Sequence, residues 1–292
     1  MKVYILMAVS LFSIHAHSQS TFDIEGHRGC RGLYPENTIT AFIEAVKLGV
    51  NTLEMDIIIS KDGKVVISHD PFMNSVICTA PDGKPVAAAD EQKYKIYNLT
   101  YDEIKKFDCG LRGNPKFPDQ KKVAVHKPLL SEVIDSVEKY VADHHLPAVH
   151  YNIETKSTIE GDDVNHPKPK IFTQMFYDII KQKGVIKKCI LQSFDVRTLQ
   201  EMKKIDSTVT TAYLVENLDG LDKNLKKLGF NPDIYSPYYM LVNKKMIHKC
   251  HHLNIKVLPW TVNDEKEMLK LKKMNVDGLI SDYPDRLIKV LR

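Results

Sequence analysis

Apolar residues in the first part of the chain follow two spacings, one typical of buried strands and one typical of the helices that cover them. Phe22–Glu25 is a short alternating run that predicts a first strand, and Thr38–Leu48 has apolar residues at helical spacing up to a terminating Gly49. Asn51–Ser60 is a β-branched run that predicts a second strand. After a turn, Val65–Ser68 predicts a short strand that pairs back onto the second.

The pattern loosens between residues 71 and 127, where glycine, proline and charged residues recur. Leu99–Phe107 predicts a short helix, and residues 110–120 resemble a loop. Irregular stretches of this length are uncommon inside a compact domain and often serve function. We therefore expect residues 71–127 to be an insertion with little regular structure, placed where it could shape the mouth of a site.

Regular alternation of strands and helices resumes after the insertion. The predicted strands are Ala148–Glu154, Lys188–Ser193, Thr208–Val215, Asp233–Ser236, Ile255–Trp260 and Val276–Ser281. The predicted helices are Ser131–Asp143, Lys170–Lys183, Asp195–Ile205, Gly220–Leu228, Lys244–Leu253, Asp264–Met274 and Pro284–Leu291. Without the hairpin strand, the chain contains eight strand–helix units. This count predicts an α/β fold, a (β/α)8 TIM barrel with an insertion after the second strand, formed by residues 19–292 as a single domain.

The N-terminus has the pattern of a targeting segment. Lys2 precedes an apolar run from Val3 to Ile14, and Ala16 and Ser18 supply small residues for a cleavage site. The run is too short to span a bilayer, and no cysteine follows the site as a bacterial lipoprotein needs. We expect residues 1–18 to be a signal peptide and the mature protein to be exported, periplasmic or secreted, without stable membrane insertion.

Composition and charge narrow the classes of partner. Of 292 residues, 43% are apolar and 27% charged, as in an ordinary globular protein, and the net charge is +4. The lysines are spread over predicted helices rather than clustered, which favours a solvated surface over a nucleic-acid footprint. The sequence leaves the oligomeric state open.

The five cysteines predict at most two disulfides and at least one free thiol. They show no C-x-x-C pair, so a zinc cluster is not expected. Cys78 and Cys109 share the irregular segment and are the pair we expect to be bridged. The pairing of Cys30, Cys189 and Cys250 stays open.

Polar residues interrupt two predicted strands in a way that indicates chemistry. Glu54 and Asp56 are two positions apart in the second strand and therefore project from one face. Glu154 and Lys156 share a face of the third strand in the same way. Neighbouring buried carboxylates resist ionisation unless a cation lies between them, and oxygen ligands suit Mg²⁺ or Ca²⁺. The pattern favours a divalent-metal site over structural ion pairs.

Basic and aromatic residues near these acids complete the candidate site. His27 and His69 follow strands and could act as an acid/base pair, although each alone would be an ordinary core or surface histidine. Arg28 and Lys156 could bind an anion such as phosphate, or simply neutralise the acids. Trp260 ends the seventh predicted strand, where a core aromatic is the simpler interpretation.

Several spaced segments in one order resemble the glycerophosphodiester phosphodiesterase family. They are G-H-R-G with P-E-N-T, L-E-M-D, K-D-G-K-V-V-I-S-H-D, N-I-E-T-K, L-Q-S-F-D, P-W-T-V-N and D-G-L-I-S-D-Y-P. The resemblance runs from about Ile24 to the C-terminus, outside residues 71–127. It implies a barrel enzyme that uses a divalent metal to hydrolyse glycerophosphodiesters to sn-glycerol 3-phosphate and an alcohol.

The resemblance also implies a role for each candidate residue. The expected metal ligands are Glu54, Asp56 and Glu154, the acid/base pair His27 and His69, the phosphate-binding groups Arg28 and Lys156, and the glycerol-pocket residue Trp260. Members of the family commonly have an insertion where residues 71–127 lie. Two features depart from the pattern: the long loop after Lys156, and Cys30, which has no assigned role.

The mechanism implied by the resemblance begins with attack by the glycerol 2-hydroxyl, giving a cyclic phosphate that water opens. The sequence does not decide which histidine is the acid. A phospholipase-D-like or lysophospholipase-D-like enzyme on the same barrel remains an alternative and would need an apolar surface near the mouth. A non-catalytic binding protein is a third alternative, although no expected catalytic residue is missing.

Overall fold

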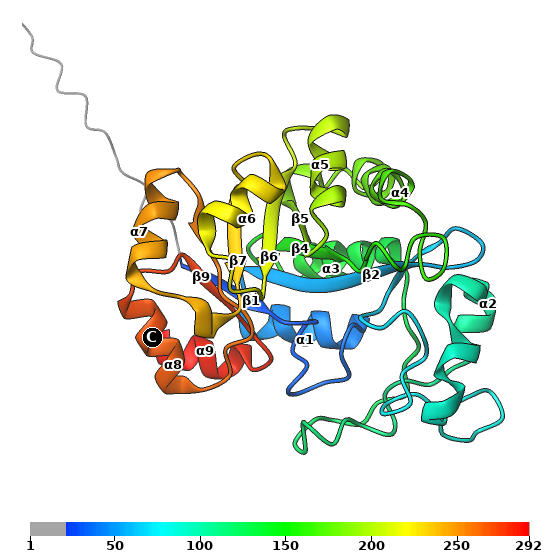
Figure 1. Cartoon of the computed structure of the whole chain (residues 1–292). Helices are drawn as coiled ribbons and strands as arrows, with labels where there is room; N and C mark the ends of the chain where they lie inside the picture. The colour runs from blue at the N-terminus through cyan, green and yellow to red at the C-terminus, as the bar shows by residue number, and fades with distance from the viewer. Residues whose placement is uncertain (1–21, 292) are drawn as a thin grey trace, which may run out of the picture.

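Eight parallel strands form a barrel wall that the helices surround, as the computed structural model of residues 22–291 shows (Figure 1). The strands follow the order β8-β7-β6-β5-β4-β2-β1-β9, and β3 pairs antiparallel with β2 outside this path. The predicted signal peptide, residues 1–18, lies outside the described residues. The wall consists of β1 (Asp23–Gly26), β2 (Thr52–Ile59), β4 (His150–Thr155), β5 (Cys189–Ser193), β6 (Thr210–Val215), β7 (Ile234–Pro237), β8 (Lys256–Val257) and β9 (Gly278–Ser281), and β3 is Val65–Ile67.

Helices follow the strands in sequence, as predicted. They are α1 (Ile39–Leu48), α2 (Tyr101–Ile104), α3 (Leu130–Asp143), α4 (Pro169–Gln182), α5 (Val196–Ile205), α6 (Leu221–Leu228), α7 (Lys244–His252), α8 (Glu265–Lys273) and α9 (Pro284–Leu291). Helix α1 illustrates the local signals: the Thr38 hydroxyl accepts a hydrogen bond from the Ala41 N–H, and Gly49 ends the helix in a left-handed conformation.

Backbone hydrogen bonds close the barrel between the segment after β7 and the last strand. The Asp277 N–H donates to the Val257 carbonyl at 2.9 Å, and the Ile280 N–H donates to the Pro259 carbonyl at 3.1 Å. The expected strand 255–260 is regular only over Lys256–Val257, because Pro259 has no N–H to continue the ladder. The (β/α)8 prediction is therefore confirmed, and the seventh strand of the wall, β8, is irregular.

Side chains of the strands alternate between two environments. In β2, Leu53, Met55 and Ile57 are fully buried in the main core between the wall and the helices. Glu54 and Asp56 point the other way, into the barrel. Below them, toward the N-terminal ends of the strands, a small apolar cluster fills the interior; its members are Ile190, Ala212, Ile234 and Leu258.

Residues 71–127 lie together at one side of the barrel (Figure 1, cyan to green). Regular structure there is short, as predicted: two 3-10 turns and α2, which covers only part of the expected helix 99–107. The sequence did not indicate that this segment has its own core. Its buried side chains include Ile77, Val86, Ile96, Ile104 and Phe107. The predicted disulfide between Cys78 and Cys109 is present and joins positions 31 apart.

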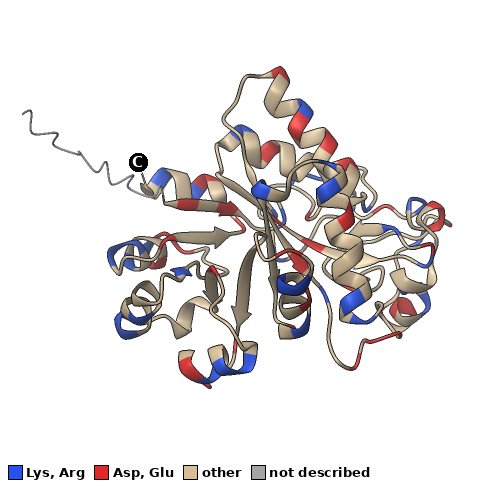
Figure 2. Cartoon of the chain, turned by 90° about the horizontal axis from the view of Figure 1, so that it is seen from above, with Lys and Arg blue, Asp and Glu red and all other residues tan. Residues whose placement is uncertain are grey.

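Charges on the outer helices alternate in sign, with basic and acidic positions interspersed (Figure 2). Across residues 22–291, no helix combines the length and the apolar character needed to cross a membrane.

Candidate active site

A cavity of about 310 Å³ opens at the C-terminal ends of the strands, where barrel enzymes carry their chemistry. It collects all the candidate residues except the fully enclosed Asp56. Its lining consists of His27, Arg28, Arg31, Glu54, His69, Glu154, Lys156, Gln192, Phe194, Leu214, Glu216, Trp260, Thr261, Ile280 and Asp282.

Three buried carboxylates converge beneath this cavity. Glu54 and Asp56 come from β2, and Glu154 lies beside Asp56 in the register of β2 with β4. One oxygen from each of the three lies within 4.8 Å of the other two. Arg28 pairs with Asp56 and Lys156 pairs with Glu154, and Arg28 is also shared with a fourth carboxylate, Glu36. An all-oxygen set of this size and charge fits a hard divalent cation.

Burial acts differently on the three acids. Desolvation, together with the charges of Asp56 and Glu154, raises the pKa of Glu54 well above its ordinary value. Desolvation also raises the pKa of Glu154, and Lys156 offsets this in part. For Asp56, desolvation is outweighed by Arg28 and other cations, and its pKa is lowered. One member of the cluster is thus firmly ionised, and the other two gain from a further positive charge.

The turn between β1 and α1 brings the backbone close to the acids. The Arg28 N–H donates to Glu54 Oε2 at 2.8 Å. A Cβ at Gly26 would lie 2.1 Å from the Gly29 carbonyl oxygen, and Gly29 has φ +87 with Ala41 atoms inside 3 Å of its missing Cβ. Only glycine fits at these two positions, which explains the G-H-R-G segment physically.

The Arg28 side chain is held between two carboxylates. Its guanidinium donates to Glu36 at 2.6 Å and lies 3.2 Å from Asp56 Oδ2. Asn37 donates to the same Asp56 oxygen at 2.8 Å. Desolvation opposes the charge of Arg28, yet Glu36 and the neighbouring acids raise its pKa, so it remains a fixed cation. The P-E-N-T segment therefore supplies the partners that orient Arg28 and Asp56.

Lys156 is the second cation of the site. Its Nζ donates to Glu154 Oε1 at 2.7 Å and lies 3.7 Å from Asp56 Oδ1. Burial lowers the pKa of Lys156, but Glu154 and Asp56 more than compensate, and the net shift is upward. It is therefore charged, as an anion-binding group must be.

Each candidate histidine has a carboxylate at Nδ1. His27 Nδ1 lies 2.5 Å from Asp282 Oδ1, and its Nε2 faces Glu54 at 3.9 Å. His69 Nδ1 lies 3.0 Å from Asp70 Oδ1. Such a partner fixes the Nδ1–H tautomer and leaves Nε2 to face the cavity. Burial lowers the pKa of His27, although Asp282 opposes that effect, so His27 is neutral near pH 7.

Trp260 is half-buried and lines the cavity rather than the core. Its indole N–H donates to the Ser236 carbonyl at 2.8 Å. The ring packs edge-to-face with Phe194, with centroids 5.4 Å apart. The simpler interpretation of Trp260 as a core aromatic is thus replaced by a position in the cavity wall.

All eight predicted site residues are brought together, and several contributors were not predicted. The sequence did not assign roles to Glu36, Asn37, Asp70, Gln192 or Asp282, although Gln192 donates to Glu54 at 2.7 Å. Glu36 and Asn37 lie in the P-E-N-T segment, and Asp70 adjoins His69, so the sequence already indicated that these three residues lie near the site. Phe194 lies in the L-Q-S-F-D segment but had no assigned role, and Glu216 had no signal beyond following a predicted strand. Cys30 is buried, and its thiol donates to the Ala41 carbonyl, which is a structural role.

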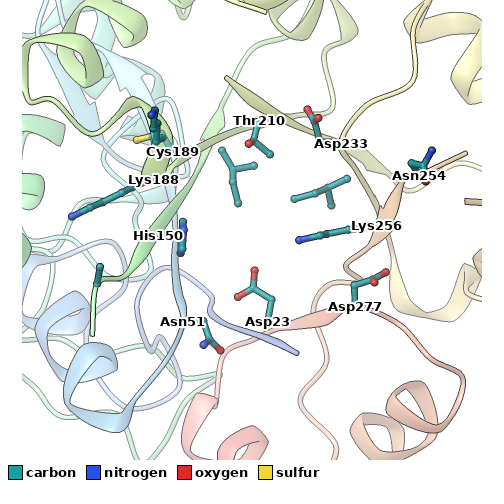
Figure 3. A pocket seen from close by; sticks show the side chains of 14 residues that line it. Asp23, Asn51, His150, Lys188, Cys189, Thr210, Asp233, Asn254, Lys256 and Asp277 are labelled. Atoms are coloured by element: carbon teal, nitrogen blue, oxygen red, sulfur yellow. The ribbon is translucent and has the colours of Figure 1, made fainter. Parts of the chain in front are cut away.

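A second hollow of about 610 Å³ lies at the opposite end of the barrel (Figure 3). Asp23 and Lys256 point into it, with His150, Asp233 and Asp277 around them. No group of three metal-binding side chains forms there among residues 22–291. Ile190 and Ile234 of the small apolar cluster line this hollow. The chemistry is therefore concentrated at the C-terminal end.

Comparisons with known proteins agree with this geometry. A model described as the glycerophosphoryl diester phosphodiesterase family matches residues 27–286. A glycerophosphodiester phosphodiesterase of Caldanaerobacter subterraneus is 29% identical over 268 residues, covering 91% of this chain and 96% of its own.

Two crystal structures are similar to the barrel. A Silicibacter pomeroyi protein provisionally described as a glycerophosphoryl diester phosphodiesterase has a TM-score of 0.83 and 27% identity, covering 94% of each chain. An Oleispira antarctica phosphodiesterase in complex with the product sn-glycerol-3-phosphate has a TM-score of 0.72 and 22% identity, covering 92% of this chain and 96% of its own, and shows the shared fold.

Proposed function

The chain belongs to the glycerophosphoryl diester phosphodiesterase family and is an enzyme of that class, and we propose the reaction that it catalyses. It hydrolyses glycerophosphodiesters to sn-glycerol 3-phosphate and an alcohol, and it uses a divalent metal and two histidines to do so. The observation that carries the proposal is the convergence of three carboxylates and two histidines on one cavity. The product named for the Oleispira structure supports the same reaction.

The metal would be held by Glu54, Asp56 and Glu154. When bound, a divalent cation there would neutralise charge on the phosphoryl oxygens and place positive charge beside the buried carboxylates. Either Ca²⁺ or Mg²⁺ suits carboxylate oxygens. Arg28 and Lys156, fixed by their own acids, would bind the remaining phosphoryl charge.

The two histidines divide the proton transfers by position. Both histidines line the hollow that contains Trp260 and Thr261, which we propose holds glycerol, but only His69 also lines the adjoining hollow. His27 would take the proton of the glycerol 2-hydroxyl as its oxygen attacks phosphorus. The bond from phosphorus to the alcohol then breaks, and His69 gives the leaving oxygen a proton. Water then opens the resulting cyclic phosphate: His69 takes a proton from the water, and His27 returns its proton to the glycerol 2-oxygen as the bond from that oxygen to phosphorus breaks.

Lysophospholipid hydrolysis is a second candidate, and exposed apolar side chains favour it. Most large apolar residues at the surface of the described chain lie in loops that follow strands or in the segment 71–127. They are Val76, Leu111, Ile159, Val164, Phe194, Leu218 and Met240. Such side chains could contact an acyl chain or a lipid surface.

Export of the mature protein remains part of the proposal. The Cys78–Cys109 disulfide supports it, because such bonds persist in oxidising compartments. Cleavage after residue 18 would be checked by N-terminal sequencing of the protein recovered from a periplasmic extract.

A substrate panel tests the proposed function. Purified protein with added Ca²⁺ or Mg²⁺ should release sn-glycerol 3-phosphate from glycerophosphocholine. Lysophosphatidylcholine, assayed in parallel, distinguishes the second candidate. Absence of turnover on both substrates with either metal would contradict the proposal.

A further inference from the structure

The cavity has a second lobe on the side of His69. This outer lobe has a volume of about 310 Å³ and is lined by His69, Pro71, Glu154, Lys156, Ser157, Thr158, Asn165, His166, Phe194 and Glu216. It shares five of these with the first hollow, namely His69, Glu154, Lys156, Phe194 and Glu216. His27 and Trp260 do not line it. A diester bound at the carboxylates with glycerol beside Trp260 would therefore extend its alcohol into the outer lobe.

Glu216 is the unusual residue of this lobe. It follows the last residue of β6 and is exposed. Among residues 22–291 it has no ion pair, whereas the cations around it are already engaged. Arg28 pairs with Glu36, Arg31 lies 3.6 Å from Asp282, and Lys156 pairs with Glu154.

An unpaired carboxylate is unfavourable for binding an anionic diester. Like charges at short range weaken binding unless the ligand carries a compensating positive charge. A leaving alcohol with an ammonium group supplies that charge at the position where Glu216 lies. A neutral polyol does not. The placement of Glu216 thus discriminates between classes of alcohol.

Phe194 adds a second feature that favours a cation. Phe194 is 39% exposed and lines both hollows. Packing against Trp260 fixes the ring at an interplanar angle of 89°. Aromatic rings attract ammonium groups. A quaternary ammonium group depends most on such contacts, because it cannot donate hydrogen bonds.

Resting on the function proposed above, we propose that Glu216 and Phe194 form a subsite for a cationic leaving alcohol, so that the enzyme prefers diesters of choline or ethanolamine type over diesters of neutral polyols. The subsite acts on the alcohol alone, because glycerol and phosphate are bound by other residues. Selectivity should therefore change without loss of the basic reaction.

Measurements of kcat/KM on four substrates test this proposal. Glycerophosphocholine and glycerophosphoethanolamine carry a cation, whereas glycerophosphoglycerol and glycerophosphoinositol do not. Glu216→Gln should lower kcat/KM about fivefold on the first two and leave the others within about twofold. Phe194→Leu should reduce the preference for choline over glycerol. Free choline should inhibit the wild type more strongly than Glu216→Gln.

Asp219→Asn is the matched control, because Asp219 lies in the same loop but pairs with Lys223. It should change none of these ratios. An equal loss on all four substrates, or no loss with Glu216→Gln, would overturn the subsite while leaving the proposed function intact. Inactivity of the wild type on all four would instead contradict both.

Discussion

Asp282 Oδ1 lies 2.5 Å from Nδ1 of His27, although 255 positions separate the two residues in the chain. Asp282 is itself held by Asn263, whose side-chain amide donates to its other oxygen at 2.8 Å. Desolvation opposes ionisation of Asp282, but His27 and Arg31 lower its pKa. A firmly ionised carboxylate therefore fixes the imidazole of His27 in one tautomer and orientation.

Replacing Asp282 by Asn should lower kcat about 10- to 100-fold, because the imidazole loses its orienting partner. Since Asp282 raises the pKa of His27, its removal should also move the acid limb of the pH–rate profile to lower pH. Initial rates between pH 5 and 9 would measure both effects. The control is Asp277→Asn, which removes a similar pair with His251 far from the site. An unchanged pH profile would rule out the orienting role.

Replacing His27 or His69 by Ala should each reduce kcat about 10²- to 10⁴-fold, as expected for loss of one proton-transfer group. Both variants should keep the circular dichroism spectrum of the wild type. His248→Ala, on the exposed face of α7, should have normal activity. Rates within a few-fold of the wild type for either site variant would remove that histidine from the mechanism.

Removing divalent metal with a chelator should abolish turnover, and adding Ca²⁺ or Mg²⁺ should restore it. Metal should also raise the melting temperature, because a ligand that binds only the folded state stabilises it. Glu154→Gln removes one of three ligands and should weaken metal binding, measured by calorimetry, about tenfold or more. The exposed Glu160→Gln should bind metal normally. Full activity after chelation would contradict the metal role.

Glu25→Gln should stabilise the protein at neutral pH. The Glu25 side chain is fully buried in the barrel, and desolvation together with the charge of Asp23 raises its pKa well above the ordinary value. The folded state therefore holds this proton more tightly than the unfolded state. The stabilisation that the protonated Glu25 contributes is fully present below the pKa of Glu25 in the unfolded state. It is lost as the pH rises from that value through the raised pKa of the folded state.

Urea unfolding at two pH values would test this expectation. Glu25→Gln should gain about 1 kcal/mol or more over the wild type at pH 7.5 and close to nothing at pH 4. Glutamine can keep the hydrogen bond that Asn152 donates to position 25 at 2.7 Å. Glu267→Gln on α8 should show no such pH-dependent gain. A gain of equal size at both pH values would indicate a packing effect instead.

Replacing Cys78 and Cys109 together by Ser should cost about 3–4 kcal/mol of unfolding free energy, the amount expected for a cross-link between positions 31 apart. Urea unfolding with and without a reductant would measure it. A reductant should destabilise the wild type and leave the double variant unchanged, since the remaining cysteines are free and buried. Equal sensitivity of both proteins would refute the assignment.

The meeting of the three buried acids was predictable because it depends on local alternation and on strand order. Glu54 and Asp56 share a face by the period of two, and Glu154 occupies the neighbouring strand. The family motifs fixed the two histidines and the cations. The register between neighbouring parallel strands then determines which of these side chains lie side by side.

The partners were harder to predict, because they depend on which loops meet in space. Asp282 was visible as a strand-ending acid, yet nothing local linked it to His27. Glu216 could be recognised as an unpaired carboxylate only from the structure, in which the cations around it pair with other acids. The core of residues 71–127 had no periodic signal, since its buried side chains come from irregular backbone that a disulfide holds.

The pairing of β1 with β9 has a consequence for synthesis. A nascent chain that has not yet reached β9 already contains the three carboxylates and both histidines. It lacks the neighbour that covers the open edge of β1, and it lacks Asp282 to hold His27. Turnover should therefore begin only after the last strand has emerged and docked, so that incomplete chains carry the parts of the active site without its activity.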